Sequence, residues 1–184
     1  MHLRQKTAVV IGTVAALAAP AGIAAAAPAS SDAVRRMDPD TTFVITAHQS
    51  NLAQMALGKI AATRGTDRDV RALGAKFAAD SAKLEAGLRP VAASIGVPLG
   101  TLPSATVTQL VTEYKSVPAA KFDALFISSQ ATLHEQAVKV VQTELKEGDA
   151  VQVKRAAQAA LPVITAHRAA LKSAQTRLGA IKRK

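Results

Sequence analysis

The sequence is constrained most by a helical spacing of apolar residues that starts at Thr41 and continues almost to the C-terminus. Apolar side chains recur there at steps of three and four residues, which places them along one side of an α-helix. No comparable run alternates apolar and polar residues as a half-buried strand would. The pattern predicts four long helices, at about residues 41–64, 66–95, 118–146 and 150–178.

These helices are expected to form an all-α four-helix bundle. Each has a single apolar stripe, and a helix of this kind can bury its stripe only against other helices. Hydrophobic residues make up 49% of the 184 residues but aromatic residues only 3%. The core must therefore consist mainly of alanine and aliphatic side chains, and small side chains let helices approach one another closely.

Glycine and proline mark the predicted helix boundaries. Gly65 stands where a residue in the left-handed conformation usually ends a helix, and the hydroxyl of Thr66 is expected to cap the next helix. Gly148 is expected to end the third long helix. Pro90 and Pro162 fall inside helical patterns, where we expect kinks and not breaks.

The connection between the second and third long helices is longer than the others. It contains GVPLGTLPS at residues 96–104, after which Ser104 can cap a short helix that ends near Pro118. A bundle needs a crossover at this point if its second and third helices run parallel, as they do in ferritin-like folds. The sequence therefore predicts a ferritin-like bundle with a short extra helix in this connector.

The first 29 residues have the order of a secretory signal peptide, with a short cationic segment, an apolar run and several small residues. We therefore expect an exported protein, either secreted or held in the envelope or periplasm. The alternative is an uncleaved membrane anchor, because the apolar run is nearly long enough to span a bilayer. Residues 30–40 are expected to form a flexible leader, 41–178 the bundle and 179–184 a basic tail.

Two histidines interrupt the apolar stripes of the third and fourth long helices. His134 lies in TLHEQAV and His167 in LPVITAHRAAL. Imidazoles in a bundle core are either hydrogen-bonded polar residues or ligands of a transition metal. A di-iron site would need Glu-x-x-His pairs, but Ala131 and Ile164 stand three residues before the two histidines. The remaining metal hypothesis is a single zinc or copper ion bound by both imidazoles.

The mature part of the sequence resembles the bacterial domain-of-unknown-function family 4142, an exported ferritin-like family. The matching pieces cover nearly all of residues 40–175. In order, they are DTTFVITAHQSNLAQMALGKIAATRGTDRDVRALGAKFAADSAKLEAGL, GVPL, KFDALFISSQATLHEQAV and LPVITAHRAALKSA. The resemblance implies a ferritin-like bundle with one inward-pointing polar residue on each long helix and with no assigned activity.

At those four positions this chain has Gln54, Ser81, His134 and His167. The resemblance implies that Gln54 and Ser81 replace stronger metal ligands, a glutamate and a histidine. Glu85, one turn after Ser81, can also point inward, and so can His48. We expect Gln54, Ser81, Glu85, His134 and His167 to form a buried polar cluster whose members hydrogen-bond one another, without a cofactor. A single divalent transition metal on His134 and His167 is the alternative.

The chain is basic, with a formal net charge of +10, and after Asp149 it has eight basic residues and no acidic one. Lys154, Arg168 and Lys172 fall on one side of the last long helix. They form either a solvated face or a contact surface for an anionic envelope polymer or a membrane surface. Sequence-specific nucleic-acid binding is not expected, because the chain has few aromatic rings on which bases could stack.

The sequence thus predicts an exported helical-bundle protein with a non-enzymatic binding or structural role. A serine such as Ser81 in the middle of a helical stripe has neither the open pocket nor the oxyanion site that a catalytic nucleophile needs. The alternative function is that of a degenerate ferritin-like metal-binding protein that uses His134 and His167.

Overall fold

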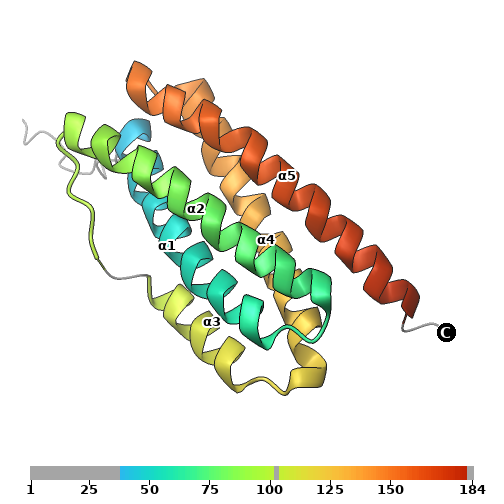
Figure 1. The fold of residues 1–184 in the computed structure, drawn as a ribbon. Coiled ribbons are helices and arrows are strands. Elements are labelled where there is room, and N and C mark those ends of the chain that lie inside the picture. The colour runs from blue at the N-terminus through green and yellow to red at the C-terminus, as the bar shows by residue number, and fades with distance from the viewer. Residues whose placement is uncertain (1–37, 102–103, 182–184) are drawn as a thin grey trace, which may run out of the picture. The chain divides into compact units, whose positions relative to one another are not determined.

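The computed structural model describes residues 38–101 and 104–181, and this part of the chain forms five α-helices and no strand (Figure 1). The predicted signal peptide, most of the predicted leader and the last three residues of the basic tail lie outside the described residues. The helices are α1 (Pro39–Arg64), α2 (Arg68–Ser94), α3 (Ala105–Ser116), α4 (Ala119–Glu147) and α5 (Val151–Ile181). None of them is long and apolar enough to cross a membrane.

The four long helices pack as a bundle of two antiparallel hairpins, α1–α2 and α4–α5 (Figure 1). The start of α4 lies at the α1–α2 turn, where the backbone N–H of Thr66 donates to Asp123 Oδ1 at 2.9 Å. The end of α4 lies near the start of α1, since the N–H of Ala150 donates to Asp40 Oδ1 at 3.1 Å. Helix α4 therefore runs antiparallel to α1 and parallel to α2, so the connector that contains α3 is a crossover.

The helix ends differ from the predicted ones in four places. Helix α5 continues to Ile181 and so includes residues 179–181 of the predicted basic tail. Helix α1 begins at Pro39, because the Asp38 side chain accepts from the N–H of Thr41. Gly65 has a φ of −55°, so it is not in the left-handed conformation. The cap of α2 is Asp67, which accepts from the N–H groups of Asp69 and Val70, whereas the hydroxyl of Thr66 bonds to Asp123.

Other predicted boundaries agree with the structure. Gly96, with a φ of 69°, adopts the left-handed conformation just after α2. Ser104 caps α3 by accepting from the N–H of Val107 at 3.4 Å. Helices α2 and α5 continue through Pro90 and Pro162, so neither proline divides its helix in two. The surrounding side-chain packing is sufficient to hold each helix despite one missing backbone donor.

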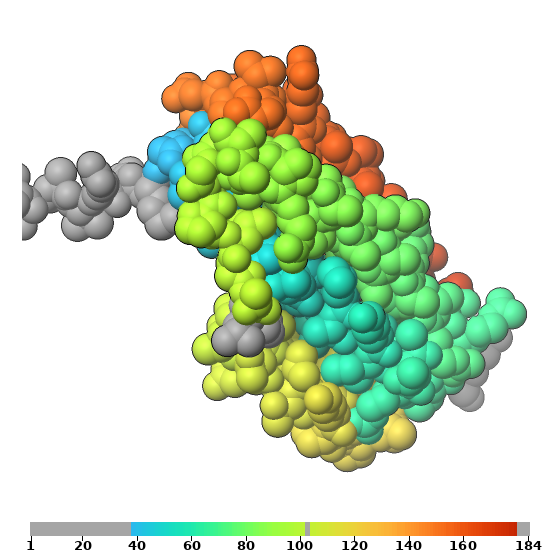
Figure 2. Space-filling model, turned by 60° about the vertical axis from the view of Figure 1, so that its left-hand side comes forward, coloured from blue at the N-terminus to red at the C-terminus, as the bar shows by residue number. Residues whose placement is uncertain are grey.

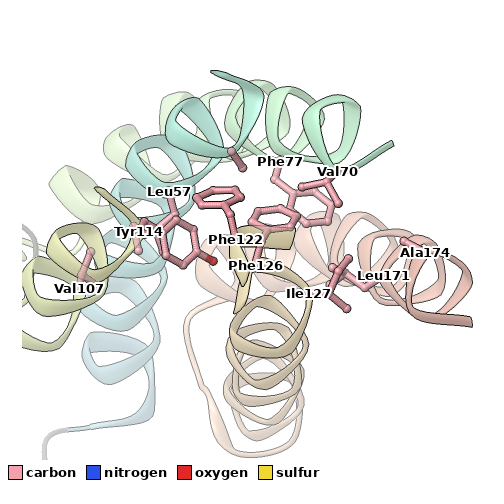
Figure 3. Packing of buried hydrophobic residues seen from close by; sticks show 12 residues of the cluster. Leu57, Val70, Phe77, Val107, Tyr114, Phe122, Phe126, Ile127, Leu171 and Ala174 are labelled. Carbon is pink, nitrogen blue, oxygen red and sulfur yellow. The ribbon is translucent and has the colours of Figure 1, made fainter. Parts of the chain in front are cut away.

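Aromatic residues fill one end of the bundle, between α3 and the hairpins (Figure 3). Phe77, Tyr114, Phe122 and Phe126 are all fully buried. Phe77 stacks on Phe126 with ring centroids 6.0 Å apart, and Tyr114 meets Phe122 edge to face at 5.4 Å. The few aromatic residues of the chain are thus concentrated where three elements must be joined, because large rings fill the wider space there.

Arg64 fastens α3 to the end of α1. Its guanidinium donates to the backbone carbonyls of Tyr114, Lys115 and Val117. These carbonyls are at the C-terminal end of α3, where a positive charge also interacts favourably with the helix dipole. The connector before α3 lies over α1 (Figure 2), and the Gly100 carbonyl is 2.7 Å from His48 Nε2.

Helices α1 and α2 approach each other most closely at two glycines. A Cβ on Gly74 would lie 2.6 Å from Ala61 Cβ and 2.7 Å from the Gly58 carbonyl oxygen. Distances this short do not occur between real side chains, so both glycines are required for the observed separation of the helices. This contact fixes the α1–α2 hairpin as a tight unit, next to which the α4–α5 hairpin packs less closely.

Candidate functional site

The structure brings together the two histidines that the sequence singled out. His134 on α4 and His167 on α5 are 3% and 2% exposed, and their atoms Nε2 and Nδ1 are 3.1 Å apart. His134 Nδ1 lies 2.8 Å from the Gln130 carbonyl oxygen, one turn earlier on α4. His167 Nε2 lies 2.9 Å from Asp80 Oδ2 on α2. The four groups form a continuous hydrogen-bonded chain across three helices.

This chain is complete only when it holds three protons. Each of its three contacts needs one hydrogen, but two neutral imidazoles supply two. With Asp80 ionised, one ring must therefore be an imidazolium, or one contact must bring two lone pairs together. The Gln130 carbonyl and the Asp80 carboxylate can only accept, so in the neutral pair one of the three contacts lacks its hydrogen.

Burial favours the neutral form of the pair. It lowers the pKa of His134 to about 4, although the hydrogen bond to Gln130 acts in the opposite direction. Burial also lowers the pKa of His167, and the carboxylate of Asp80 partly offsets this effect. Asp80 has a lowered pKa because it accepts hydrogen bonds from Lys76 first and from His167 second. Near neutral pH the pair is therefore short of its third proton.

The ring of Phe77 closes one side of the pair. Its centroid is 4.8 Å from that of His134 and 4.3 Å from that of His167. Below Phe77 lies the aromatic end of the bundle, as Figure 3 shows. The histidine pair therefore marks the border between a well-filled core and a space on its other side.

That space is a cavity of about 830 Å³ between the two hairpins, and the start of α3 also lines it. His134 and His167 line its floor, together with Gln54 on α1 and Ser81 on α2. The walls are mainly apolar and include Phe43, Leu88, Val91, Val140, Val141 and Ile164. No Asp or Glu side chain within residues 38–101 and 104–181 lines the cavity, whereas Lys83 and Arg155 do.

Gln54 and Ser81 lie in the same layer as the histidines but do not complete their hydrogen bonds. Gln54 is 9% exposed, and its side-chain oxygen has no hydrogen-bond partner among the described residues. A buried amide oxygen without a partner is uncommon in folded proteins, because leaving it unbonded costs about 1–3 kcal/mol. The expected mutual satisfaction of Gln54, Ser81, His134 and His167 is therefore wrong for Gln54.

Glu85 belongs to a second network and not to the histidine layer. Its carboxylate is 2.8 Å from His48 Nδ1 and also contacts Asn51 and Arg89. His48 Nε2 faces the Gly100 carbonyl, so both ring nitrogens of His48 face oxygens that accept hydrogen bonds. This network ties the connector to α1 and α2.

The buried side of α4 contains two polar residues that its apolar spacing alone does not indicate. Ala131 is exposed, whereas Gln130 and Glu144 are fully buried. Gln130 stands four residues before His134, and Glu144 stands three residues after Val141. This helical spacing could have placed both polar residues on the buried side. Because Ala131 stands next to Gln130 and Leu145 next to Glu144, the apolar spacing fitted these two neighbours better.

Glu144 is buried beside Asp40 at the start of the hairpins. Burial raises the pKa of Glu144 to about 7, and the neighbouring Asp40 carboxyl adds to the effect. Asp40 itself accepts from the backbone N–H groups of Asp149 and Ala150, just before α5. The carboxyl of Glu144 is thus protonated over much of the acidic range. It lies at the opposite end of the cavity region from the histidine pair.

The predicted basic face is only partly exposed. Arg168 and Lys172 are exposed and Lys154 is half-buried, and none of the three forms an ion pair within the described ranges. Arg177, on another side of α5, is instead paired with Asp69.

The donor set does not fit a resident metal ion. No group of three or more His, Cys, Asp or Glu that could hold a metal occurs in the part of the chain that the structure describes. The two imidazoles supply one available nitrogen each, since the other nitrogen of each is engaged by Gln130 or Asp80. Zinc and copper sites use three or four protein donors, so the predicted site has at most half of a coordination sphere.

The fold and the buried layer define a class of protein, an all-helical bundle of two hairpins joined by a crossover. The chain belongs to the family described as domain of unknown function DUF4142, whose model matches residues 24–174. Its fold is similar to that of a DUF305 fragment from Deinococcus radiodurans, with a TM-score of 0.63 and 17% sequence identity. The similarity covers 78% of this chain and 97% of that one and concerns the fold alone. No curated protein matches this chain.

Proposed function

We propose that the protein is an exported, non-enzymatic binding protein on a ferritin-like bundle, which takes up a small apolar molecule between its two hairpins. The observation that supports this proposal is the cavity of about 830 Å³ with apolar walls and a polar floor. Binding sites for small molecules typically have volumes of about 300–1,000 Å³, with mostly apolar linings and a few placed polar groups. The signal-peptide pattern of residues 1–29 supports export.

The chemistry of the floor supports binding rather than catalysis. Both rings of the histidine pair are fixed by bonds to Gln130 and Asp80, so neither is free to act as the base of Ser81. A nucleophilic serine needs a base in hydrogen-bond contact and donors for the developing oxyanion. We therefore assign the polar floor to recognition of a ligand's polar group.

A neutral fluorescent probe, N-phenyl-1-naphthylamine, tests this proposal in the mature chain, residues 30–184. We expect saturable enhancement of its emission with one site per chain. Ala137→Phe places a ring in the cavity and should reduce the affinity at least about tenfold. Ala131→Phe adds the same ring on the exposed side of α4 and should leave it unchanged. Equal binding by both variants would show that the probe does not occupy this cavity.

A second candidate function is attachment to an anionic envelope polymer or membrane surface through Lys154, Arg168 and Lys172. The favouring observation is that these three cations form no ion pair within residues 38–101 and 104–181. Replacing all three by Gln should weaken retention on heparin and reduce its salt dependence. Replacing the exposed Lys59, Lys115 and Lys121 by Gln removes the same charge elsewhere. Equal effects of the two triple substitutions would leave only net charge as the cause.

The metal-binding alternative is decided by elemental analysis of the mature chain purified without a histidine tag. Since the donor set is incomplete, we expect less than about a tenth of an equivalent of zinc, copper, iron or manganese. Close to one equivalent, lost on substitution of His134 or His167 by Gln, would overturn the assignment of the pair to ligand recognition.

A further inference from the structure

We propose that the molecule held in the cavity is a single-chain amphiphile with a carboxylate head, and that its head lies at the His134–His167 pair and is bound together with one proton. This inference rests on the proposed function, because it names the class of ligand for the same cavity. Three observations point to it: the sign of the lining charges, the missing proton of the histidine pair, and the unpartnered side-chain oxygen of Gln54.

The lining charges favour an anion. Lys83 and Arg155 line the cavity, and no carboxylate among the described residues does. Asp80 lies behind His167 and is held by Lys76 at 2.7 Å and Lys83 at 4.0 Å. Arg168 on α5 adds a further positive charge near His134. The surroundings of the floor are thus cationic even before the imidazoles take up a proton, which matches a carboxylate head by charge.

The histidine pair supplies a charge that appears when the ligand is bound. In the free protein the two neutral rings carry two protons for three contacts, so one of these contacts lacks its hydrogen. A carboxylate that enters from solution stabilises an imidazolium beside it, so a proton from solvent completes the three contacts. The balance is one anion and one proton taken up per site, with no bond of the ligand broken.

On α1, Gln54 faces the expected position of the carboxylate head. Its amide lines the cavity and is nine-tenths buried, and one of its polar ends is unbonded. Because the oxygen and nitrogen of an amide are exchanged by a simple flip, the NH₂ group of Gln54 can donate to a carboxylate oxygen. The Ser81 hydroxyl lines the same floor and can donate as well.

The walls fit an alkyl chain above this head. From His167 to Arg155 the cavity follows twelve residues of α5, or roughly 18 Å at 1.5 Å per residue. Alanines 156, 159 and 160 line that stretch, and their small side chains leave room for an elongated apolar chain. The rings of Tyr114, Phe122 and Phe126 lie on the other side of Phe77, so the alkyl chain can extend only away from them.

Isothermal titration of the mature chain with dodecanoate and with dodecanol, both below micellar concentrations, tests the inference. At pH 6 we expect dodecanoate to bind at least about tenfold more tightly than dodecanol, because Gln54 and Ser81 can donate hydrogen bonds to a charged head and the imidazolium charge lies beside it. Titrations in two buffers of different ionisation enthalpy should report close to one proton taken up with dodecanoate and none with dodecanol. The affinity for dodecanoate should rise by up to about tenfold for each unit that the pH falls from 8 to 6.

Two variants localise the head group. Gln54→Leu should weaken dodecanoate without weakening dodecanol, and His167→Gln should abolish the proton uptake. His48→Gln alters the other buried histidine, which does not line the cavity, and should leave the proton uptake intact. Circular dichroism melts establish that each variant is folded, and the comparison of the two ligands on the unchanged protein does not depend on any variant.

The two proposals fail in different ways. If the naphthylamine probe binds but dodecanoate and dodecanol bind equally, or dodecanoate binds without proton uptake, the anionic head is refuted and the cavity keeps its binding role. If probe, acid and alcohol all fail to bind, both proposals are refuted. Tight dodecanoate binding that His167→Gln leaves unchanged in affinity and in proton uptake would place the head elsewhere and refute the inference.

Discussion

The close contact of α1 and α2 predicts opposite effects for one substitution at two places on the same helix. Replacing Gly74 by Ala puts a Cβ 2.6 Å from Ala61 Cβ, 2.7 Å from the Gly58 carbonyl oxygen and 2.8 Å from the Ala62 backbone nitrogen. Ordinary contact begins at 3.4 Å, so the helices must separate locally by about 0.8 Å. Two of the three opposing atoms are backbone, which cannot rotate away as a side-chain end can.

The magnitude follows from two opposing contributions. Alanine is favoured over glycine inside a helix by about 1 kcal/mol. Overpacking of a filled contact costs about 1–3 kcal/mol, and a gap of 0.5–1 Å between facing side chains forfeits about a quarter to a half of their dispersion energy. With rigid backbone opposite, the upper end of the overpacking range applies, so Gly74→Ala should lower the free energy of unfolding by about 2 kcal/mol.

Gly87 is the matched control. It lies on α2, is exposed, and a Cβ there would meet no atom within 4 Å. Gly87→Ala should therefore gain helix propensity without a clash and raise the free energy of unfolding by about 0.5–1 kcal/mol. Urea denaturation of both variants measures the difference, and thermal melts should move by about 2–4 °C for each kcal/mol. A Gly74→Ala variant as stable as Gly87→Ala would refute the backbone-to-backbone contact.

Three further predictions concern polar groups. Because the pKa of Glu144 is raised to about 7, the free energy of unfolding of the wild type should fall as pH rises from about 4.5 to 7. Glu144→Gln should remove about 1–3 kcal/mol of this loss, which urea titrations at pH 4 and 8 would measure. Asp80→Asn should lower the pKa of His167 further, which NMR titrations would show. It should also increase the loss of stability below about pH 6.5, where the imidazole of the unfolded chain takes up a proton. Arg64→Gln should release α3, and hydrogen exchange should become faster in α3 but not in α5.

Much of the fold was predictable because the apolar spacing is a local property. The helices, the short helix after Ser104 and the continuous helix through Pro162 follow from residues within one or two turns of each other. The parallel direction of α2 and α4 was open in the sequence, since a long connector permits a crossover but does not require one. The contacts of Thr66 and Asp40 with distant parts of the chain decide it.

The candidate site was predictable to a smaller extent. His134 and His167 could be placed inward because each falls on an apolar stripe, and they do meet. The assignment of Glu85 to their cluster was wrong, because two residues one turn apart on α2 face different neighbours. The unpaired side-chain oxygen of Gln54 and the cavity could not be foreseen, since an empty space depends on the separation of two hairpins and not on any one helix.

The sequence by itself determined which segments are helical and which side of each helix is apolar, because hydrophobic spacing and capping act between residues that are close along the chain. Only the tertiary structure decided which polar groups share protons and which remain unpaired. That outcome depends on distances of about 3 Å between atoms on different helices, and such distances are set by packing at sites such as Gly58 and Gly74. The tight α1–α2 hairpin and the looser contact with α4–α5 together create the cavity above the histidine pair.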